Sequence, residues 1–499
     1  MLSPIAARAV GGSGRFSTSG GEDIWSTYRP TQDEEQPETS TEEEEKKGRG
    51  AYLLTCLIGY SMSFIVFGSQ VSILGPTIAG LADRLGVEEP DLSPLFTALG
   101  VSCIVSGTPS GWLVDRMPTH HVLIGSLVIE AIGFSLVPLM PSVWSLTALY
   151  FVVCFSYNFT NSAVFTSLAW MFPKRAGPGI NLVLAMFGLG SFFIPLAAQA
   201  CKIYLGSALA VFYLVGGLAA LSAVPFFFVA SPTRPAAAGG DGAHGARHHA
   251  SRSLELVTTV AVVVLVFFTT AAETAIGNWI YTFSLREVGD SDAAAAAANS
   301  GFWGAFTVGR VIGAAISHAT TPAVLLLGSV PFSILGCALP LLAGRAHLSR
   351  TLVMAMAALT GLGNSTGYAN AVALLERYVP VTGFINGVFG AVAGGACMVG
   401  PVLVAMMAKY TSLRYMSMPW VGLVLYSLHL PAIITAIAAG TKLLALPLAP
   451  EEEPFLASGG PAAGGGAAAA AAENGGTTSA GVPAAVAPQA EGAVANGHH

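Results

Sequence analysis

Gly111-Trp112-Leu113-Val114-Asp115-Arg116 closes an apolar stretch that begins near Asp91 and is long enough to cross a bilayer as a helix. A glycine in such a helix allows a neighbouring helix to approach closely. An Asp-Arg pair at the lipid–water boundary can hold one end of a helix bundle shut and release it again. The stretch therefore predicts a membrane-embedded helix bundle with a movable contact at one end.

The composition of the whole chain agrees with this interpretation. Of the 499 residues, 53% are hydrophobic and 10% are charged, whereas soluble domains carry roughly 25% charged residues. Helices are expected, because every backbone polar group must be satisfied inside the bilayer, and a barrel would show short alternating segments instead. Twelve apolar segments have about the length of a spanning helix: 51–74, 92–113, 121–139, 143–168, 178–200, 207–230, 256–281, 296–317, 323–342, 349–371, 382–408 and 416–440.

We therefore predict an all-α polytopic membrane protein with twelve transmembrane helices in two six-helix halves. The expected parts are a disordered tail at 1–48, a first half at 49–230, a cytoplasmic linker at 231–252, a second half at 253–442 and a disordered Ala/Gly-rich tail at 443–499. The tails and the linker have compositions that cannot bury a core. Residues 1–20 hold Arg and Ser but no acid, which fits either an organelle transit peptide or an ordinary tail.

The two halves echo each other in sequence at an offset of about 205 residues. Asn161, Pro173, Ile180-Asn181 and Phe187-Gly188 recur in the same order as Asn370, Pro380, Ile385-Asn386 and Phe389-Gly390. The echo predicts that the fourth and fifth spans correspond to the tenth and eleventh. Two such halves would be parallel repeats.

Lys and Arg gather on one side of the first half. If the N-terminus is cytoplasmic, the inner side holds Lys46, Lys47, Arg49, Arg116, Lys174, Arg175, Arg234, Arg247 and Arg252, and the outer side holds Arg84 and Lys202. Positively charged loops favour the cytoplasmic side. We expect a multi-pass protein with both termini in the cytoplasm, in either the plasma membrane or an organelle membrane.

The Gly-x-x-x-Asp-Arg ending of the second span resembles the signature of the major facilitator superfamily of transporters. Met117-Pro118-Thr119-His120-His121 replaces the usual Gly-x-basic continuation. In that superfamily two parallel six-helix halves enclose a substrate site near the midplane of the membrane.

Three further strings resemble the sodium-dependent glucose transporter-like branch of this superfamily, a relative of bacterial fucose permeases. They are Phe67-Gly68 with Ile73-Leu74-Gly75-Pro76-Thr77, Glu273 with Gly277-Asn278-Trp279-Ile280-Tyr281, and Phe302-Trp303-Gly304-Ala305-Phe306-Thr307-Val308-Gly309-Arg310. The resemblance covers about residues 51–440. It implies a hexose-type substrate and coupling to a cation, Na⁺ or H⁺.

Glu273 is the first candidate for a binding residue, because charges within spans are costly and usually functional. In helical register Glu273 and Tyr281 share one face, and Asn278 flanks it. These polar groups could bond sugar hydroxyls while Trp279 stacks on the apolar face of the ring. The alternative is a glutamate that hydrogen-bonds a neighbouring helix.

Glu130 is the other carboxyl well inside a span. Burial favours the uncharged form of a carboxyl, so Glu130 and Glu273 are candidates for cation coupling, although Glu130 could instead serve only packing. Arg310 keeps its charge and needs a partner, either in a gate or in a fixed ion pair.

Asp115 and Arg116 are the remaining gate candidates. In the resembled fold the end of the second span meets the start of the eleventh, here Thr382-Gly383. A carboxylate gains roughly 0.3–1 kcal/mol near a helix N-terminus, so the contact would favour a closed cytoplasmic end. The alternative is a solvated helix end.

Amide side chains gather in the first, fourth and tenth spans. Gln70, Asn158, Asn161 and Asn370 are candidates for binding the solute, and hydrogen bonds between helices are the alternative.

No Walker loop, His-Glu-x-x-His motif or nucleophile elbow occurs in the sequence, so we expect no enzyme, no cofactor, no metal site and no nucleic-acid partner. The leading hypothesis is a transporter of a sugar or similar polyhydroxylated solute that works as a monomer by alternating access. The alternatives are a monocarboxylate-type organic anion transporter and a transport-inactive sensor or scaffold.

Overall fold

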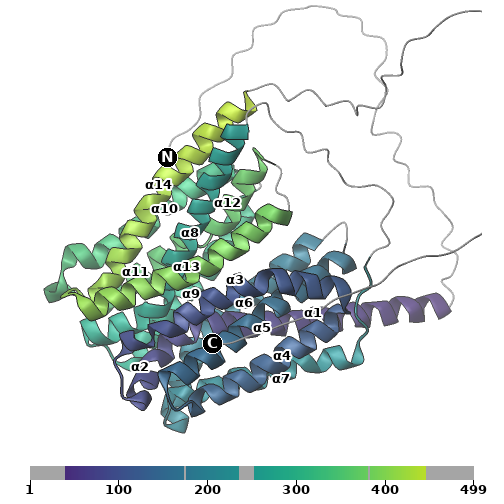
Figure 1. Cartoon of the computed structure of the whole chain (residues 1–499), viewed down its shortest axis with the longest axis horizontal. Coiled ribbons are helices and arrows are strands. Elements are labelled where there is room, and N and C mark those ends of the chain that lie inside the picture. Colours follow the sequence, from purple (N-terminus) through teal and green to yellow (C-terminus); the bar gives the residue numbers. More distant parts are fainter. Residues whose placement is uncertain (1–39, 173–175, 235–251, 318, 380–382, 446–499) are drawn as a thin grey trace, which may run out of the picture. The chain divides into compact units, whose positions relative to one another are not determined.

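The computed structural model describes residues 40–172, 176–234, 252–317, 319–379 and 383–445 (Figure 1). Within these ranges every regular element is a helix. The first half holds α1 (Ser40–Ser72), α2 (Leu74–Leu85), α3 (Ser93–Arg116), α4 (Thr119–Leu136), α5 (Val143–Met171), α6 (Ala176–Leu205) and α7 (Val211–Phe228). The second half holds α8 (Arg252–Phe283), α9 (Asp292–Ile316), α10 (Pro322–Ala343), α11 (Arg350–Asn364), α12 (Gly367–Glu376), α13 (Gly383–Tyr410) and α14 (Ser417–Leu444). Short 3-10 turns are η1 (Glu89–Leu92), η2 (Val137–Leu139), η3 (Ala208–Ala210), η5 (Arg345–His347) and η6 (Arg414–Met416), and η4 (Ser284–Val288) is a π turn.

Ten of the described helical segments are long and apolar enough to cross a bilayer, which confirms an all-helical polytopic membrane protein. Two of the twelve predicted spans differ from this group. Residues 296–317 lie in α9, where Asn299 and Arg310 lower the hydropathy. Residues 349–371 are divided between α11 and α12, which are separated by Ser365 and Thr366. Spanning by α9 and by the α11–α12 pair stays a prediction.

The start of α1 lies before the apolar part of the helix. The helix begins at Ser40, inside the segment 1–48 that we expected to be disordered. Glu42 to Lys47 are strong helix formers, so the helix continues beyond its apolar part. The other residues expected to be disordered, 1–39, 235–251 and 446–499, lie outside the described ranges.

Helix packing repeats between the two halves. α1 packs on α6 as α8 packs on α13, α3 packs on α5 as α9 packs on α11, and α4 packs on α7 as α10 packs on α14. In each case the helices of the second contact lie six predicted spans after those of the first, in agreement with the sequence echo. The halves meet along two further helix pairs, α3 with α13 and α6 with α9. Replacing each helix by its equivalent in the other half converts one of these pairs into the other.

Glycines permit the closest of these contacts. A Cβ atom at Gly68 of α1 would lie 1.8 Å from the carbonyl oxygen of Phe187 on α6. A Cβ atom at Gly400 of α13 would lie 2.0 Å from the carbonyl oxygen of Ala271 on α8. The two contacts occupy equivalent helix pairs, so both halves depend on direct approach of one backbone to another.

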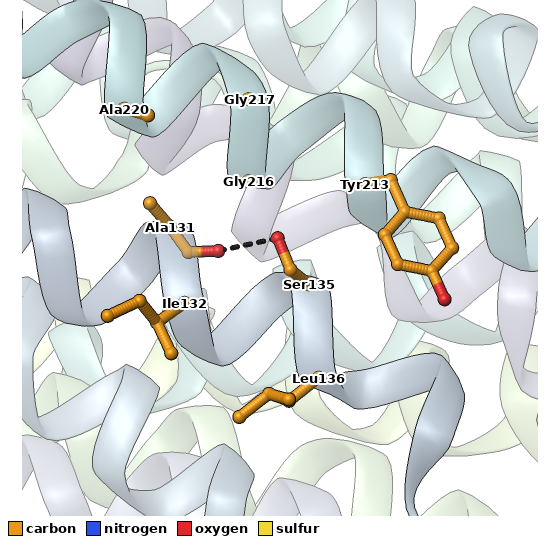
Figure 2. A pocket seen from close by; sticks show the side chains of 8 residues that line it. All are labelled: Ala131, Ile132, Ser135, Leu136, Tyr213, Gly216, Gly217 and Ala220. Atoms are coloured by element: carbon orange, nitrogen blue, oxygen red, sulfur yellow. Dashed lines mark hydrogen bonds between the residues drawn. The ribbon is translucent and has the colours of Figure 1, made fainter.

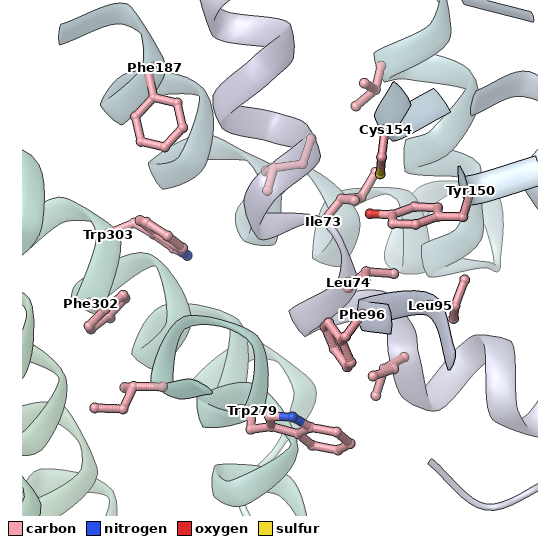
Figure 3. Packing of buried hydrophobic residues seen from close by; sticks show 14 of the residues in the cluster. Ile73, Leu74, Leu95, Phe96, Tyr150, Cys154, Phe187, Trp279, Phe302 and Trp303 are labelled. Carbon is pink, nitrogen blue, oxygen red and sulfur yellow. The ribbon is translucent and has the colours of Figure 1, made fainter. Parts of the chain in front are cut away.

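Aromatic rings fill part of the boundary between the halves (Figure 3). Phe96 of α3 lies 5.9 Å, between ring centroids, from Trp279 of α8. Phe187 of α6 lies 6.4 Å from Trp303 of α9. All four side chains are buried, so the boundary has an apolar core of its own.

Gly68→Ala should destabilise the protein, because its methyl group overlaps the Phe187 carbonyl and overpacking costs about 1–3 kcal/mol. The midpoint of thermal unfolding in detergent should fall below that of the parent. Gly217→Ala is the matched control, since Gly217 is exposed on a helix and no atom lies within 4 Å of an added Cβ. Equal midpoints for the two variants would contradict the close α1–α6 contact.

Candidate functional site

Ion pairs join the two halves at one end of the bundle. The pairs are Glu89–Arg286 at 2.5 Å, Asp91–Lys409, and Lys202–Asp292 at 2.7 Å, each with one partner from either half. Tyr415 adds a further link, because its hydroxyl donates to Glu89 at 2.8 Å. This end is therefore closed by charged contacts.

Toward the other end α3 and α13 separate. A Cβ at Gly394 of α13 would lie 2.7 Å from the Cβ of Cys103 on α3. One and two turns further along the same faces, Gly107 and Gly111 on α3 and Gly387 on α13 are exposed, with no atom within 4 Å of an added Cβ. Among the described residues, α3 and α13 thus touch in the middle of their length and not at Gly107, Gly111 or Gly387.

Asp115 and Arg116, the predicted gate residues, lie at this separated end and are exposed. The Arg116 guanidinium lies 4.3 Å from the centroid of the Trp112 ring. Among the described residues Asp115 has no hydrogen bond or ion pair. Thr382, which belongs to its expected partner segment, lies outside the described ranges.

Between the two ends, three polar side chains of the second half converge. Asn364 of α11 donates its amide N–H to Glu273 Oε2 of α8 at 3.1 Å, and Arg310 of α9 interacts electrostatically with the same carboxylate. The Arg310 guanidinium lies 4.3 Å from the centroid of Phe306 and 5.6 Å from that of Phe187. Because Phe187 belongs to the first half, this polar cluster of Glu273, Arg310 and Asn364 reaches the boundary between the halves.

The first half presents aromatic rings beside that cluster. Phe67 of α1 stacks on Tyr157 of α5 with centroids 3.8 Å apart, and Phe187 of α6 lies 4.7 Å from Phe67. We call these three rings the aromatic wall. Phe67 and Tyr157 are half-buried.

Of the aromatic wall, sequence reasoning had not assigned Phe67 and Phe187 to the site. Two signals pointed to them: Phe67-Gly68 belongs to a string shared with the resembled family, and Phe187-Gly188 belongs to the internal echo. In the structure Gly68 brings α1 against the Phe187 backbone, which places the two rings together.

The remaining candidates of α8 point elsewhere in this conformation. Trp279 is fully buried, and its indole N–H donates to the Pro401 carbonyl at 3.1 Å. The Tyr281 hydroxyl donates to Asp292 Oδ1 at 2.9 Å, close to the closed end. Asn278 donates to a carbonyl of its own helix at 2.9 Å, and its buried Oδ1 has no partner.

The other predicted amides bond within their own halves. Gln70 donates to Cys154 Sγ at 3.4 Å, Asn158 donates to α3, and Asn370 donates to a carbonyl of its own helix at 3.0 Å. Asn161 is half-buried on the same helix as Asn158. In this conformation Gln70 and Asn158 therefore make the inter-helix contacts that were the alternative to solute binding.

Glu130 lies apart from the polar cluster, inside the first half. It is 1% exposed on α4, and its Oε1 is 2.7 Å from the Thr160 hydroxyl of α5. That hydroxyl is 2.8 Å from the hydroxyl of Ser126, one turn before Glu130 on α4.

Two grooves lined by described residues contain none of the predicted site residues. Figure 2 shows one of about 440 Å³ between α4 and α7, lined mainly by small and apolar residues from Ala131 to Leu136 and from Tyr213 to Ala220. The other lies beside His120 and Phe226. The described residues hold no group of three or more His, Cys, Asp or Glu side chains placed to bind a metal ion.

Comparison with known proteins identifies relatives over most of the chain. A family model described as Major Facilitator Superfamily matches residues 60–344. Sodium-dependent glucose transporter 1A of Mus musculus is 25% identical over 434 residues, covering 78% of this chain and 97% of that protein. Sodium-dependent glucose transporter 1 of Xenopus laevis is 24% identical over 347 residues, covering 63% and 68%. These matches confirm the predicted family resemblance as a distant homology.

Among solved structures, a D-xylose-proton symporter has a TM-score of 0.60 at 14% identity, covering 77% of this chain and 97% of that one. At this identity the likeness shows a shared fold alone. It agrees with the paired packing of the two six-helix halves.

Lys409→Glu should open the end that the ion pairs close, because it sets two carboxylates against each other at Asp91. Spin labels at Arg84→Cys and His347→Cys, exposed positions of opposite halves at this end, should move apart, with the population shifted by a factor of a few. Adding Asp91→Lys to Lys409→Glu should restore the parental distance. A distance that is the same in parent and Lys409→Glu would show that the pair does not hold this end closed.

Proposed function

Because the chain belongs to the major facilitator superfamily, a family of transporters and not of enzymes, we propose that it moves a sugar or a similar small polyhydroxylated solute across a membrane by alternating access. The solute would lie between the halves at 49–230 and 253–442, where Phe187 of the aromatic wall lies beside Arg310 of the polar cluster.

The chemistry of that site carries the proposal. A sugar has an apolar ring face and an edge of hydroxyl groups. Phe67 and Tyr157 offer ring faces from one half, while Glu273 and Asn364 offer hydrogen-bonding groups from the other. Mostly apolar sites with a few placed polar groups are typical of small-molecule recognition. Several relatives are named as sodium-dependent glucose transporters, which supports a hexose-type solute.

The arrangement of the two ends supports alternating access. One end is closed by ion pairs, and at the other end no atom of the described residues lies within 4 Å of an added Cβ at Gly107, Gly111 or Gly387. We expect the solute to enter from that second end in this conformation. If both termini are cytoplasmic, the separated end faces the cytoplasm. Asp115 and Arg116 would then meet the start of α13 when that end closes.

Arg310 gives a second candidate function. The half-buried Arg310 lies at the boundary between the halves, beside Phe187. A guanidinium there could bind the carboxylate of a monocarboxylate. An organic anion transporter is therefore the alternative, and a transport-inactive sensor or scaffold would move neither class of solute.

Uptake into proteoliposomes separates these functions. Radiolabelled D-glucose should enter vesicles that contain the parent protein, and Glu273→Gln should reduce the rate by about tenfold or more, since a hydrogen bond to a charged group contributes ~1.5–3 kcal/mol. Asp83→Asn, which alters an exposed carboxylate on α2, is the matched control and should transport as the parent does.

L-lactate tests the second function in the same vesicles. Uptake of lactate but not of glucose, lost in Arg310→Gln, would favour the organic anion transporter. No uptake of either solute by folded protein would favour the sensor or scaffold. Glucose uptake that is unchanged in Glu273→Gln would remove Glu273 from the site.

A further inference from the structure

Glu130 is buried where its own neighbourhood provides no positive charge. α5 and α7, the helices that pack on α4, contain no Lys, Arg or His. His120 and His121 stand at the start of α4, about 15 Å away along the helix. The titratable groups facing Glu130 from α5 are Cys154 and Tyr157.

The other packed elements supply no partner either. α7 contributes only Tyr213, which is exposed, and η2 contributes no titratable group. α3, which touches α4 lightly, carries Cys103 in its middle and Asp115 and Arg116 at its exposed end. An ionised carboxylate buried without a counter-charge is so costly that it takes up a proton or binds a cation.

Counting hydrogens around Glu130 distinguishes these two outcomes. Four oxygen atoms form a chain: Glu130 Oε1 to Thr160 Oγ1 at 2.7 Å, Thr160 Oγ1 to Ser126 Oγ at 2.8 Å, and Ser126 Oγ to the Leu123 carbonyl at 3.0 Å. Three hydrogen bonds need three hydrogens, but the two hydroxyls supply only two. The third belongs on the Glu130 carboxyl, which then donates to Thr160, while Thr160 donates to Ser126 and Ser126 to Leu123.

If Glu130 loses its proton, the chain can reverse. Ser126 then donates to Thr160, and Thr160 donates to the carboxylate. Ser126 then no longer donates to the Leu123 carbonyl, so one hydrogen bond is lost. That carbonyl oxygen still accepts the ordinary backbone hydrogen bond of the α-helix. The same atoms can therefore serve both protonation states.

A sodium ion fits this place poorly. Hard cations bind several oxygen ligands that converge on one point, whereas these oxygens stand in a row at hydrogen-bonding distances from one another. We propose that Glu130, with Thr160 and Ser126, is an exchangeable proton-binding site, and that the cation taken by this transporter is H⁺ and not Na⁺. The coupling part rests on the proposed transport function, whereas the binding of the proton does not.

The proton site is separate from the solute site but shares a helix with it. Thr160 lies one turn after Tyr157 on α5, and Tyr157 stacks on Phe67 in the aromatic wall. Reversal of the hydrogen-bond chain alters the contact between α4 and α5 directly beside that wall. Release of the proton is thereby linked to the surface that the solute would contact.

Infrared difference spectroscopy of the purified protein in lipid tests the proposal without any solute. At neutral pH the parent should show the carbonyl band of a protonated carboxyl, which shifts in D₂O, disappears as the pH is raised, and is unaffected when Na⁺ replaces K⁺. Glu130→Gln should lack this band and still unfold at the parental temperature, since its amide N–H can donate to Thr160. Glu273→Gln is the matched control and should keep the band.

Three results would overturn the proposal. A parent without a Glu130-dependent band at neutral pH would mean an ionised carboxylate. A band removed by Na⁺ would identify a sodium site. A band that responds to neither D₂O nor pH would mark a fixed structural proton. Each result is independent of whether glucose or lactate is transported, so failure of this inference is distinguishable from failure of the proposed function.

Discussion

Close approach at glycines decides which helices of this protein move together. Gly68 sets α1 directly on α6, and Gly400 sets α13 directly on α8, so each half is braced by contacts between backbones. Such contacts cannot slide without collision, because no flexible side chain lies between the helices. Between the halves, Gly394 and Cys103 bring α13 and α3 together in the middle of the bundle. In the proposed transport cycle the halves would rock about this central contact.

The general architecture could be predicted because it depends on composition and length. Apolar segments of spanning length must be helical in a bilayer, and the Gly-x-x-x-Asp-Arg ending indicated the family. The differences arose where the local sequence is polar within a span. Arg310 lowers the hydropathy of α9 but has Phe187, Phe306 and Glu273 around it, and Ser365 interrupts the tenth span beside Gly309 of α9. Hydropathy measures residues one at a time and does not include such partners.

The site could be predicted only in part, because the sequence shows single residues and helix faces but not contacts between distant segments. Glu273 stood out as a charge within a span, and helical register placed Tyr281 on its face. Register could not show that the neighbouring Trp279 packs on Phe96 of the other half, or that Asn364 bonds Glu273. These contacts join segments far apart in the chain. The inter-half ion pairs were missed because their members lie near helix ends, where charges look like ordinary surface residues.

The ion pairs make the closed end of the molecule sensitive to dissolved salt. Their side chains range from 12% to 47% exposed, so dissolved salt reaches them, and screening shortens from about 10 Å at 0.1 M ionic strength to about 3 Å at 1 M. The ionic strength of the compartment at the closed end therefore weakens the closed arrangement. Salt added on that side of the membrane would favour separation of the two halves there.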